Sequence, residues 1–377
     1  MWLVPALRFP EFTEEWQGEQ LHEIAELSKG IGISKEQLSE NGTPCILYGE
    51  LYTKYKSEII SKIISKTDIE KSKLKHSKQN DVIIPCSGET AIDIAVARCV
   101  PFDNVLLGGD LNVIRLHKYD GAFMAYQLNG KRKTDIAKLA QGVSVVHLYG
   151  ENLKSIKTYN PSLQEQQKIV KLLSMLDERL EVQNKIIEAL KLLRDAISGL
   201  IFNSMKNEKT ILLGNVACIS NGSGDVQDSD SIKRDGWYPF FDRSEEQKWF
   251  PTYSFNREAI IYAGEGQNFF PRYYKGKFAL HQRCYAITDF CECLLPKYCL
   301  YFMNTLNSYF IRNAVGSTVP SLRMDMFQKA KIKIPTIERQ QEIVSTLDAL
   351  SLKCENEEIV RALYNTQKSY LLQQLFI

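Results

Sequence analysis

The chain has 377 residues and a formal net charge of +2; 44% of its residues are hydrophobic and 24% are charged. This composition is typical of folded globular proteins and excludes extensive disorder, and the length suits two or more domains. No apolar run reaches the roughly 18 residues of a membrane helix, and the N-terminal segment lacks the apolar core of a signal peptide. We therefore expect a cytoplasmic protein that does not enter a membrane.

The first half opens with a lysine-rich segment. Residues 54–78 carry eight lysines against three acidic side chains. Such a segment is compatible with a basic face for nucleic acid and is equally typical of a solvated surface. Short apolar runs bounded by glycine, proline, asparagine or aspartate then predict strands in both halves, and these halves have the pattern of mixed α/β domains. The runs lie at 82–84, 113–116, 259–262 and 284–287.

A long helix is predicted after Pro161. The sequence Asn160-Pro161-Ser162-Leu163 shares its first two residues with the NPPY loop of amino-methyltransferases, but it lacks the second proline and the aromatic residue. We interpret it as a helix cap, in which Ser162 and Glu165 form a capping box. Apolar residues from Ile169 to Ile201 then follow a heptad pattern, which predicts a rod of about 60 Å at 1.5 Å per residue. A second helix after Pro335 has an apolar face that continues through Val360, Leu363 and Leu375.

An internal repeat connects the two helices. Residues 140–202 and 314–376 align without a gap at a constant offset of 174. The identical pairs include Gly142/Gly316, Leu148/Leu322, Pro161/Pro335, Gln166/Gln340, Gln167/Gln341, Ile169/Ile343, Leu173/Leu347 and Phe202/Phe376. The repeat predicts a mixed α/β (α+β) protein with pseudo-two-fold internal symmetry, in which two globular halves are separated by two long helices that pack as an antiparallel coiled coil. In the alternative arrangement, each helix packs only on its own half.

The sequence contains none of the common catalytic motifs. P-loop, dinucleotide-binding, HExxH and GxSxG patterns do not occur, and we assign no catalytic residue. Cys284, Cys291, Cys293 and Cys299 follow His281, but their spacing does not match that of structural zinc sites, so we expect core thiols and no metal site. In a cytoplasmic protein, nine scattered cysteines favour reduced thiols over a disulfide framework.

The positive signal is for nucleic acid. Basic side chains are interleaved with aromatic residues and amides; lysine and arginine contact phosphates or guanine edges, and glutamine reads adenine. Each cluster alone is also typical of plain surface, and only the recurrence in both halves favours DNA. The candidates in the first half are Tyr48, Lys54, Lys56, Ser87, Arg98, Lys131, Arg132 and Lys133. Those in the second half are Arg243, Lys248, Gln267, Arg272, Tyr273, Lys275, Lys277, Gln282 and Arg283.

The repeated motif resembles that of the specificity subunits of type I restriction-modification systems. In that family a glycine is followed six positions later by leucine, and then by a proline and the sequence Glu-Gln-x-x-Ile-Val. This chain has the two copies at 142–170 and 316–344. It departs from the pattern at Arg339, where glutamate is usual, and at Asn160, where the residue before the proline is usually apolar.

The resemblance implies an architecture of four consecutive parts. Residues 1–158 and 207–333 would be target-recognition domains, and 159–206 and 334–377 conserved helical regions. The protein would be a non-catalytic subunit that binds a bipartite, asymmetric site in double-stranded DNA, with the helices as a ruler between the two elements. It would direct adenine methylation and DNA cleavage by partner subunits.

The resemblance also implies the partners. Two methylation subunits, which bind S-adenosylmethionine, would dock on the helices and the edges of both halves, and motor-nuclease restriction subunits would join them, so no cofactor is expected in this chain. The residues expected to bind partners are Gln166, Gln167, Ile169, Leu173, Gln340, Gln341, Ile343 and Leu347.

Two other interpretations are compatible with the residues. A coiled-coil scaffold with two protein-binding domains would use the basic and aromatic loops for protein contacts and would have no affinity for DNA. A nuclease built from scattered acidic and lysine side chains would require metal-dependent cleavage by the isolated chain.

Overall fold

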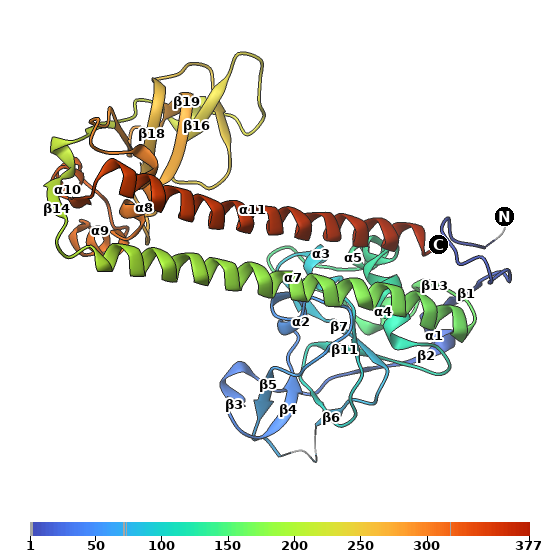
Figure 1. Cartoon of the computed structure of the whole chain (residues 1–377). Coiled ribbons are helices and arrows are strands. Elements are labelled where there is room, and N and C mark those ends of the chain that lie inside the picture. The colour runs from blue at the N-terminus through green and yellow to red at the C-terminus, as the bar shows by residue number, and fades with distance from the viewer. Residues whose placement is uncertain (1–2, 71, 73, 317) are drawn as a thin grey trace. The chain divides into compact units, whose positions relative to one another are not determined.

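The structure is a computed structural model that describes residues 3–70, 72, 74–316 and 318–377 (Figure 1). The chain forms two compact units: unit 1 is Met1–Lys185 with Ile359–Ile377, and unit 2 is Ile186–Glu358. The long helices α7 (Leu163–Ser204) and α11 (Ile337–Gln374) each contribute to both units. The mixed α/β class, the two similar units and the long helices predicted from the sequence are confirmed.

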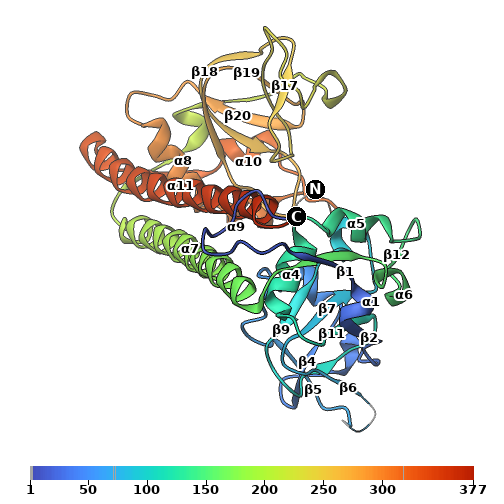
Figure 2. The same cartoon turned by 90° about the vertical axis from the view of Figure 1, so that its right-hand side faces the viewer.

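Unit 1 is built on an antiparallel four-stranded sheet with the order β2-β11-β7-β9 (Figure 2). The predicted apolar runs form its centre, β7 (Asp81–Pro85) and β11 (Leu111–Leu116), because continuous apolar strands are stable only when both faces are covered. A second, mixed sheet has the order β3-β5-β4-β10-β6. The other strands are β1 (Gln17–Gln20), β2 (Ala25–Lys29), β3 (Leu38–Ser39), β4 (Thr43–Ile46), β5 (Ser65–Thr67), β6 (Lys75–His76), β8 (Ser87–Gly88), β9 (Arg98–Val100), β10 (Leu106–Leu107), β12 (Val146–His147) and β13 (Lys157–Asn160).

Unit 2 repeats this scaffold with a larger sheet. Its strand order is β15-β20-β18-β19-β16-β17, and the first four strands are antiparallel, like the four of unit 1. The runs predicted at 259–262 and 284–287 lie in β18 and β20. The strands are β14 (Lys209–Leu212), β15 (Cys218–Asn221), β16 (Tyr238–Phe241), β17 (Lys248–Phe250), β18 (Phe255–Ala263), β19 (Arg272–Leu280), β20 (Cys284–Thr288) and β21 (Lys331–Ile334).

One helix in each unit covers the sheet and contacts a long helix. In unit 1 this helix is α4 (Gly121–Asn129), and in unit 2 it is α8 (Pro296–Asn304). The ring of Phe376 lies 5.2 Å from that of Phe123 in α4, and the ring of Phe202 lies 5.3 Å from that of Phe302 in α8. Each long helix therefore begins in one unit, and the repeated phenylalanine at its far end packs in the core of the other unit. The shorter helices are α1 (Leu21–Ile24), α2 (Glu50–Thr53), α3 (Ala91–Ile94), α5 (Lys133–Lys138), α6 (Gly150–Leu153), α9 (Asn307–Asn313) and α10 (Met324–Gln328).

The two long helices run antiparallel wherever they meet within one unit. In unit 1, Lys368 lies 2.5 Å from Asp177, and in unit 2, Lys191 lies 2.6 Å from Glu358. The predicted seam is confirmed at its well-spaced positions, because Ile169, Leu173, Ile343 and Leu347 are all buried in the cores. The later part of the second stripe differs from the prediction at one position. Leu363 is 63% exposed, so it lies outside the buried face.

The start of α7 corrects one detail of the predicted cap. The amide of Glu165 donates to the hydroxyl of Ser162 over 3.4 Å, as in a cap. The Glu165 carboxylate does not close a capping box: it accepts bonds from the Arg8 guanidinium at 2.8 Å and from the Trp16 indole at 3.3 Å. A charge-assisted partner brought by the N-terminal segment has replaced the local backbone amide.

The glycine motif forms the same small hairpin in both units. Gly142 and Gly316 have φ values of 119° and 107°, a region that favours glycine, which explains why the repeat retains them. The following leucines each donate a backbone bond of 2.7 Å, Leu148 to Cys86 and Leu322 to Gly264. Ser317, which belongs to the second copy of the motif, lies outside the described residues.

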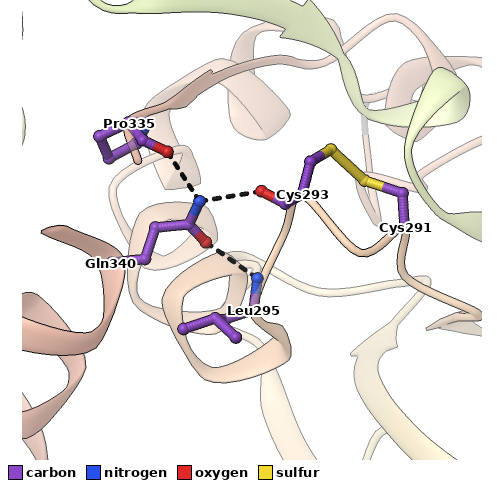
Figure 3. Close-up of a disulfide and its surroundings, with 5 residues drawn as sticks. All are labelled: Cys291, Cys293, Leu295, Pro335 and Gln340. Atoms are coloured by element: carbon purple, nitrogen blue, oxygen red, sulfur yellow. Dashed lines mark hydrogen bonds between the residues drawn. A yellow bond between two sulfur atoms is a disulfide. The ribbon is translucent and has the colours of Figure 1, made fainter. Parts of the chain in front are cut away.

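The cysteines of unit 2 behave in two ways. Cys284 and Cys299 are buried thiols, as predicted, and burial raises the pKa of Cys284 to about 11, so it stays neutral at physiological pH. Cys291 and Cys293 are joined by a disulfide (Figure 3). The expectation of core thiols is therefore wrong for this pair, because a tight turn before α8 brings the two side chains together.

Candidate nucleic-acid interface

The lysine-rich segment of unit 1 contains the strands β5 and β6 of the mixed, five-stranded sheet. Lys54 and Lys56 are exposed, and Lys54 pairs with Glu50 at 2.8 Å. Tyr48 is half-buried and packs on the core between the sheets, so it offers only part of its ring. Lys71 and Lys73, two of the eight lysines, lie outside the described residues. Lys54 and Lys56 are thus the candidates here whose charge reaches solvent.

Two candidates of unit 1 lie inside the domain. Arg98 is only 7% exposed, and its guanidinium donates to the carbonyl oxygens of Leu51 at 3.2 Å and Tyr55 at 2.9 Å. Ser87 is 5% exposed and donates its hydroxyl to Asp110 at 3.1 Å. The prediction that these residues contact DNA is not supported, because both side chains are used to hold loops together. Burial also lowers the pKa of Arg98, an effect that Glu58 and Asp177 oppose.

The basic run at 131–133 leads from α4 into α5, whose first residue is Lys133. All three side chains are half-buried. Arg132 donates to the carbonyl oxygen of Ile377 at 2.7 Å and pairs with Asp135 at 3.1 Å. Arg132 therefore anchors the end of α11 on unit 1, and Lys131 and Lys133 are the members of the run that remain as candidates for phosphate contacts.

In unit 2 some candidates bond to other groups of the domain, and the others are exposed to solvent. Arg272 donates to the carbonyl oxygens of Ser244, at 2.9 Å, and Asp242, and Lys248 pairs with Asp242 at 2.7 Å. These two cations therefore hold the loop at 242–248. Tyr273 donates its hydroxyl to Glu258; burial, and then that bond, raise its pKa.

The exposed candidates of unit 2 lie on and around the β18–β19 hairpin. Lys275 is 73% exposed and lies 4.0 Å from Glu258, while Arg283 is 66% exposed and pairs with Glu265 at 2.6 Å. Because exposed ion pairs contribute little stability, a phosphate can replace these carboxylates at small cost. The other exposed candidates are Arg243, Gln267, Lys277 and Gln282.

The predicted site residues include only Lys277 from a group of cations that lie over aromatic rings. The Lys277 ammonium lies 4.8 Å from the Tyr253 ring centroid, Lys233 lies 4.7 Å from Trp249, and Arg234 lies 4.9 Å from Trp237. We call these six residues the aromatic–basic patch. Aromatic faces and cations together suit sugar-phosphate and base contacts. The run Lys233-Arg234 shortly before Trp237 was the available sequence signal. Trp249 in β17 and Lys277 in β19 belong to the same sheet only because both strands pair with β16, which is a tertiary feature.

Most residues expected to bind partner subunits are buried within the chain itself. Ile169, Leu173, Ile343 and Leu347 belong to the cores, and Gln166 and Gln340 are fully buried. This corrects their assignment as docking residues, because a partner cannot reach them. Gln167 and Gln341, one position further along each helix, are exposed and keep that role as candidates.

The two buried glutamines make matching hydrogen bonds. Gln166 donates to the Pro161 carbonyl oxygen at 2.8 Å and accepts from the Asp120 amide at 2.9 Å. Gln340 donates to the Pro335 carbonyl oxygen at 2.9 Å and accepts from the Leu295 amide at 2.9 Å (Figure 3). Asp120 and Leu295 are the N-cap residues of α4 and α8. Each glutamine thus joins the start of a long helix to the start of the helix that covers the sheet.

The long helices also expose apolar side chains. Examples are Val182 at 54% and Tyr370 at 60% in unit 1, and Leu192 at 72% and Leu200 at 73% in unit 2. Apolar groups exposed along a helix are typical of faces that bind another protein. Within the described part of the chain no helix is long and apolar enough to cross a membrane. Among the same residues, no group of three or more histidine, cysteine or acidic side chains is arranged to hold a metal ion.

Comparison with known proteins relates this geometry to one family. The family model described as "Type I restriction modification DNA specificity domain" matches residues 13–192 and 205–362. The Escherichia coli type I restriction enzyme EcoDI specificity subunit is 32% identical over 149 residues, which are 39% of this chain and 32% of that protein. The matched segment thus spans about a third of that relative.

Two solved structures share the fold. The S subunit of the type I restriction-modification system from M. genitalium has a TM-score of 0.63 at 17% identity and covers 99% of both chains. A chain from a study of complex assembly and conformational transition in a type I system has a TM-score of 0.58 at 15% identity, covering 96% of this chain and 97% of its own. Since the two matches to the family model together span most of the sequence, the chain belongs to the type I restriction-modification DNA specificity family.

Proposed function

We propose that this chain is the non-catalytic DNA-recognition subunit of a type I restriction-modification complex. Unit 1 reads one short element of a bipartite, asymmetric site in double-stranded DNA, and unit 2 reads the other. The observation that carries the proposal is one scaffold used twice with different surfaces. The four-stranded sheet of unit 1 and the first four strands of the six-stranded sheet of unit 2 share their strand order, while the exposed basic groups differ. Two domains of one design with different surfaces suit a target with two different elements.

The candidate contacts to DNA are the predicted residues whose charged or polar groups reach solvent, together with the aromatic–basic patch. In unit 1 they are Lys54, Lys56, Lys131 and Lys133, and in unit 2 the aromatic–basic patch with the exposed residues around the β18–β19 hairpin. Lysine and arginine that reach phosphates supply most of the affinity, and the amides of Gln267 and Gln282 suit the reading of base edges. The near-neutral net charge of +2 means that binding depends on where these cations lie.

The catalytic steps belong to partner subunits in this proposal. Two methylation subunits, which hold S-adenosylmethionine and modify adenine, bind the exposed faces of α7 and α11, and motor-nuclease subunits join for restriction. Gln167, Gln341 and exposed apolar residues such as Leu192 and Leu200 are the contacts that we propose. This division of labour is consistent with the lack of common catalytic motifs in the sequence.

Methylation mapping tests the proposal directly. The chain is expressed with the methylation subunit of the same operon in a host without other adenine methylation, and long-read sequencing locates modified adenines. We expect a single bipartite motif with a modified adenine in each element. An assembled complex that modifies no motif would contradict the proposal and would favour a scaffold with two protein-binding domains.

A further inference from the structure

Both copies of the repeated motif contain a buried hydrogen-bond clamp, and the clamp consists of the same groups each time. In unit 1 the Gln166 amide spans from the carbonyl of Pro161 to the amide of Asp120, and in unit 2 Gln340 spans from Pro335 to Leu295. The four distances lie between 2.8 and 2.9 Å, and both glutamines have no exposed surface. A buried amide is costly unless its groups are satisfied, so two buried glutamines that are each bonded through both the nitrogen and the oxygen of the amide indicate a geometric requirement.

The clamps lie at the junction between recognition domain and long helix. Pro161 and Pro335 precede α7 and α11, whereas Asp120 and Leu295 begin α4 and α8, which cover the sheets. Apolar contacts across this junction are numerous but allow sliding, because the hydrophobic effect has no direction. Hydrogen bonds are directional, and the amide fixes the angle between the two helix starts as well as their distance.

From these contacts we infer that Gln166 and Gln340 are positioning residues that fix the tilt of each recognition domain on its helix and thereby the spacing between the two DNA elements. The inference rests on the proposed function. The required precision is high: on a rod of about 60 Å, a tilt of about 3° displaces the far end by about 3 Å, which is close to one base-pair step.

The surroundings of the two clamps show how each is reinforced. Beside Gln166, the carboxylate of Glu165 binds Arg8 and Trp16. The corresponding residue in the second copy is Arg339, which is exposed and pairs with Glu342 at 2.7 Å. There the clamp has an additional bond, since Gln340 also donates to the carbonyl oxygen of Cys293 at 2.9 Å, next to the disulfide (Figure 3). Each clamp is thus reinforced by a further contact: the bonds of the neighbouring Glu165 to the N-terminal segment in unit 1, and a third hydrogen bond of Gln340 itself in unit 2.

The test compares spacer selection by variants of the complete methylation complex. Gln340→Met removes both the donor and the acceptor at nearly constant volume, and Gln340→Glu keeps an acceptor for the Leu295 amide but loses the donor. Gln328→Met, at an exposed glutamine of α10 in unit 2 with no role in the clamp or in partner binding, is the matched control. In unit 1, Gln166→Met is compared with Gln79→Met, which also replaces an exposed glutamine. Each complex is purified, its assembly is checked, and methylation is measured on sites whose spacer is native, one base pair shorter or one base pair longer.

We expect the clamp variants to keep both half-site sequences and to lose about tenfold in discrimination between native and altered spacers, which corresponds to about 1.4 kcal/mol. The control variants should select spacers as the wild type does. Unchanged spacer selection by an assembled Gln340→Met or Gln166→Met complex would overturn the inference. Failure of every clamp variant to assemble, while both controls assemble, would also overturn it, because the glutamines would then serve stability alone.

This experiment separates the inference from the proposed function. If the wild-type complex methylates no bipartite site, the proposed function fails and the clamps are not in question. If the wild type methylates one bipartite motif and the clamp variants keep its spacer, only the inference fails. Loss of overall methylation without a change in spacer preference counts against a positioning role, because a weakened fold lowers activity equally on all spacers.

Discussion

Replacement of Lys368 should loosen the C-terminal end of α11 from unit 1. Its ammonium group lies 2.5 Å from both Glu58 and Asp177, and the side chain is only 13% exposed. Asp177 also accepts bonds from the hydroxyl groups of Tyr126 at 2.6 Å and Ser57 at 3.0 Å. Lys368→Met keeps the length of the side chain but leaves two carboxylates buried without their cation.

The expected cost follows from the burial of the partners. Glu58 and Asp177 have exposed side-chain fractions of 7% and 8%, so water cannot replace the missing charge. Removal of one member of a buried ion pair costs about 3 to 5 kcal/mol. We expect the lower end, about 3 kcal/mol, because Tyr126 and Ser57 still donate to Asp177.

Denaturant unfolding followed by circular dichroism measures this loss, and hydrogen exchange shows whether residues 359–377 lose protection first. Lys185→Met is the control: Lys185 pairs with Glu181 at 2.6 Å but is 70% exposed, and such pairs contribute less than about 1 kcal/mol. The triple variant Glu58→Gln/Asp177→Asn/Lys368→Met leaves no unpaired carboxylate at this site and should recover part of the stability. The recovery is partial because Arg98, which is 7% exposed, loses the two carboxylates that oppose its burial. Equal stability of Lys368→Met and Lys185→Met would refute the reasoning.

The effect also has a defined dependence on pH. Burial lowers the pKa of Lys368, but Glu58 and Asp177 together raise it above the ordinary value of 10.5. A raised lysine pKa stabilises the folded state fully below the unfolded pKa, and this contribution is lost as pH rises through the folded pKa. The difference between wild type and Lys368→Met should therefore stay constant from neutral pH to about pH 10 and shrink above it.

Three further predictions concern the core, the DNA contacts and the disulfide. Phe376→Ala should cost about 3 to 5 kcal/mol in the free energy of unfolding, because the ring is 1% exposed and packs on Phe123 and Trp16. Leu363→Ala, on the exposed face of α11, should change the free energy of unfolding by less than about 0.5 kcal/mol. In a DNA-binding titration, Lys277→Ala should reduce by about 1 the magnitude of the slope of log binding constant against log salt concentration. Lys248→Ala should change this slope less, because the ammonium group of Lys248 is already paired with Asp242. Equal slopes for the two variants would exclude a phosphate contact at Lys277. When the folded protein is alkylated and analysed by mass spectrometry, Cys218 should be modified because it is an exposed thiol. The peptide that contains Cys291 and Cys293 should be modified only after reduction. Alkylation of this peptide without reductant would show that the pair is a dithiol.

Patterns within short stretches of sequence predicted the elements and their buried faces. The heptad spacing from Ile169 onward predicted α7, and the runs at 82–84 and 259–262 predicted strands, which the structure places inside the two sheets. Such signals succeed because helix and strand periodicity is set by local geometry, and because the same apolar face must be buried in any arrangement of the domains. The repeat added the two-unit design, since similar sequences bury similar faces.

The roles of polar residues were decided by the tertiary structure. Glu165 resembled a capping-box member but binds Arg8, 157 positions earlier in the chain. Arg98 resembled a DNA contact but holds the carbonyl groups of Leu51 and Tyr55. A polar side chain has similar local signals whether its partner is water, DNA or a distant backbone group. Its role depends on which groups the folded chain brings within about 3 Å, and spacing along the sequence does not contain that information.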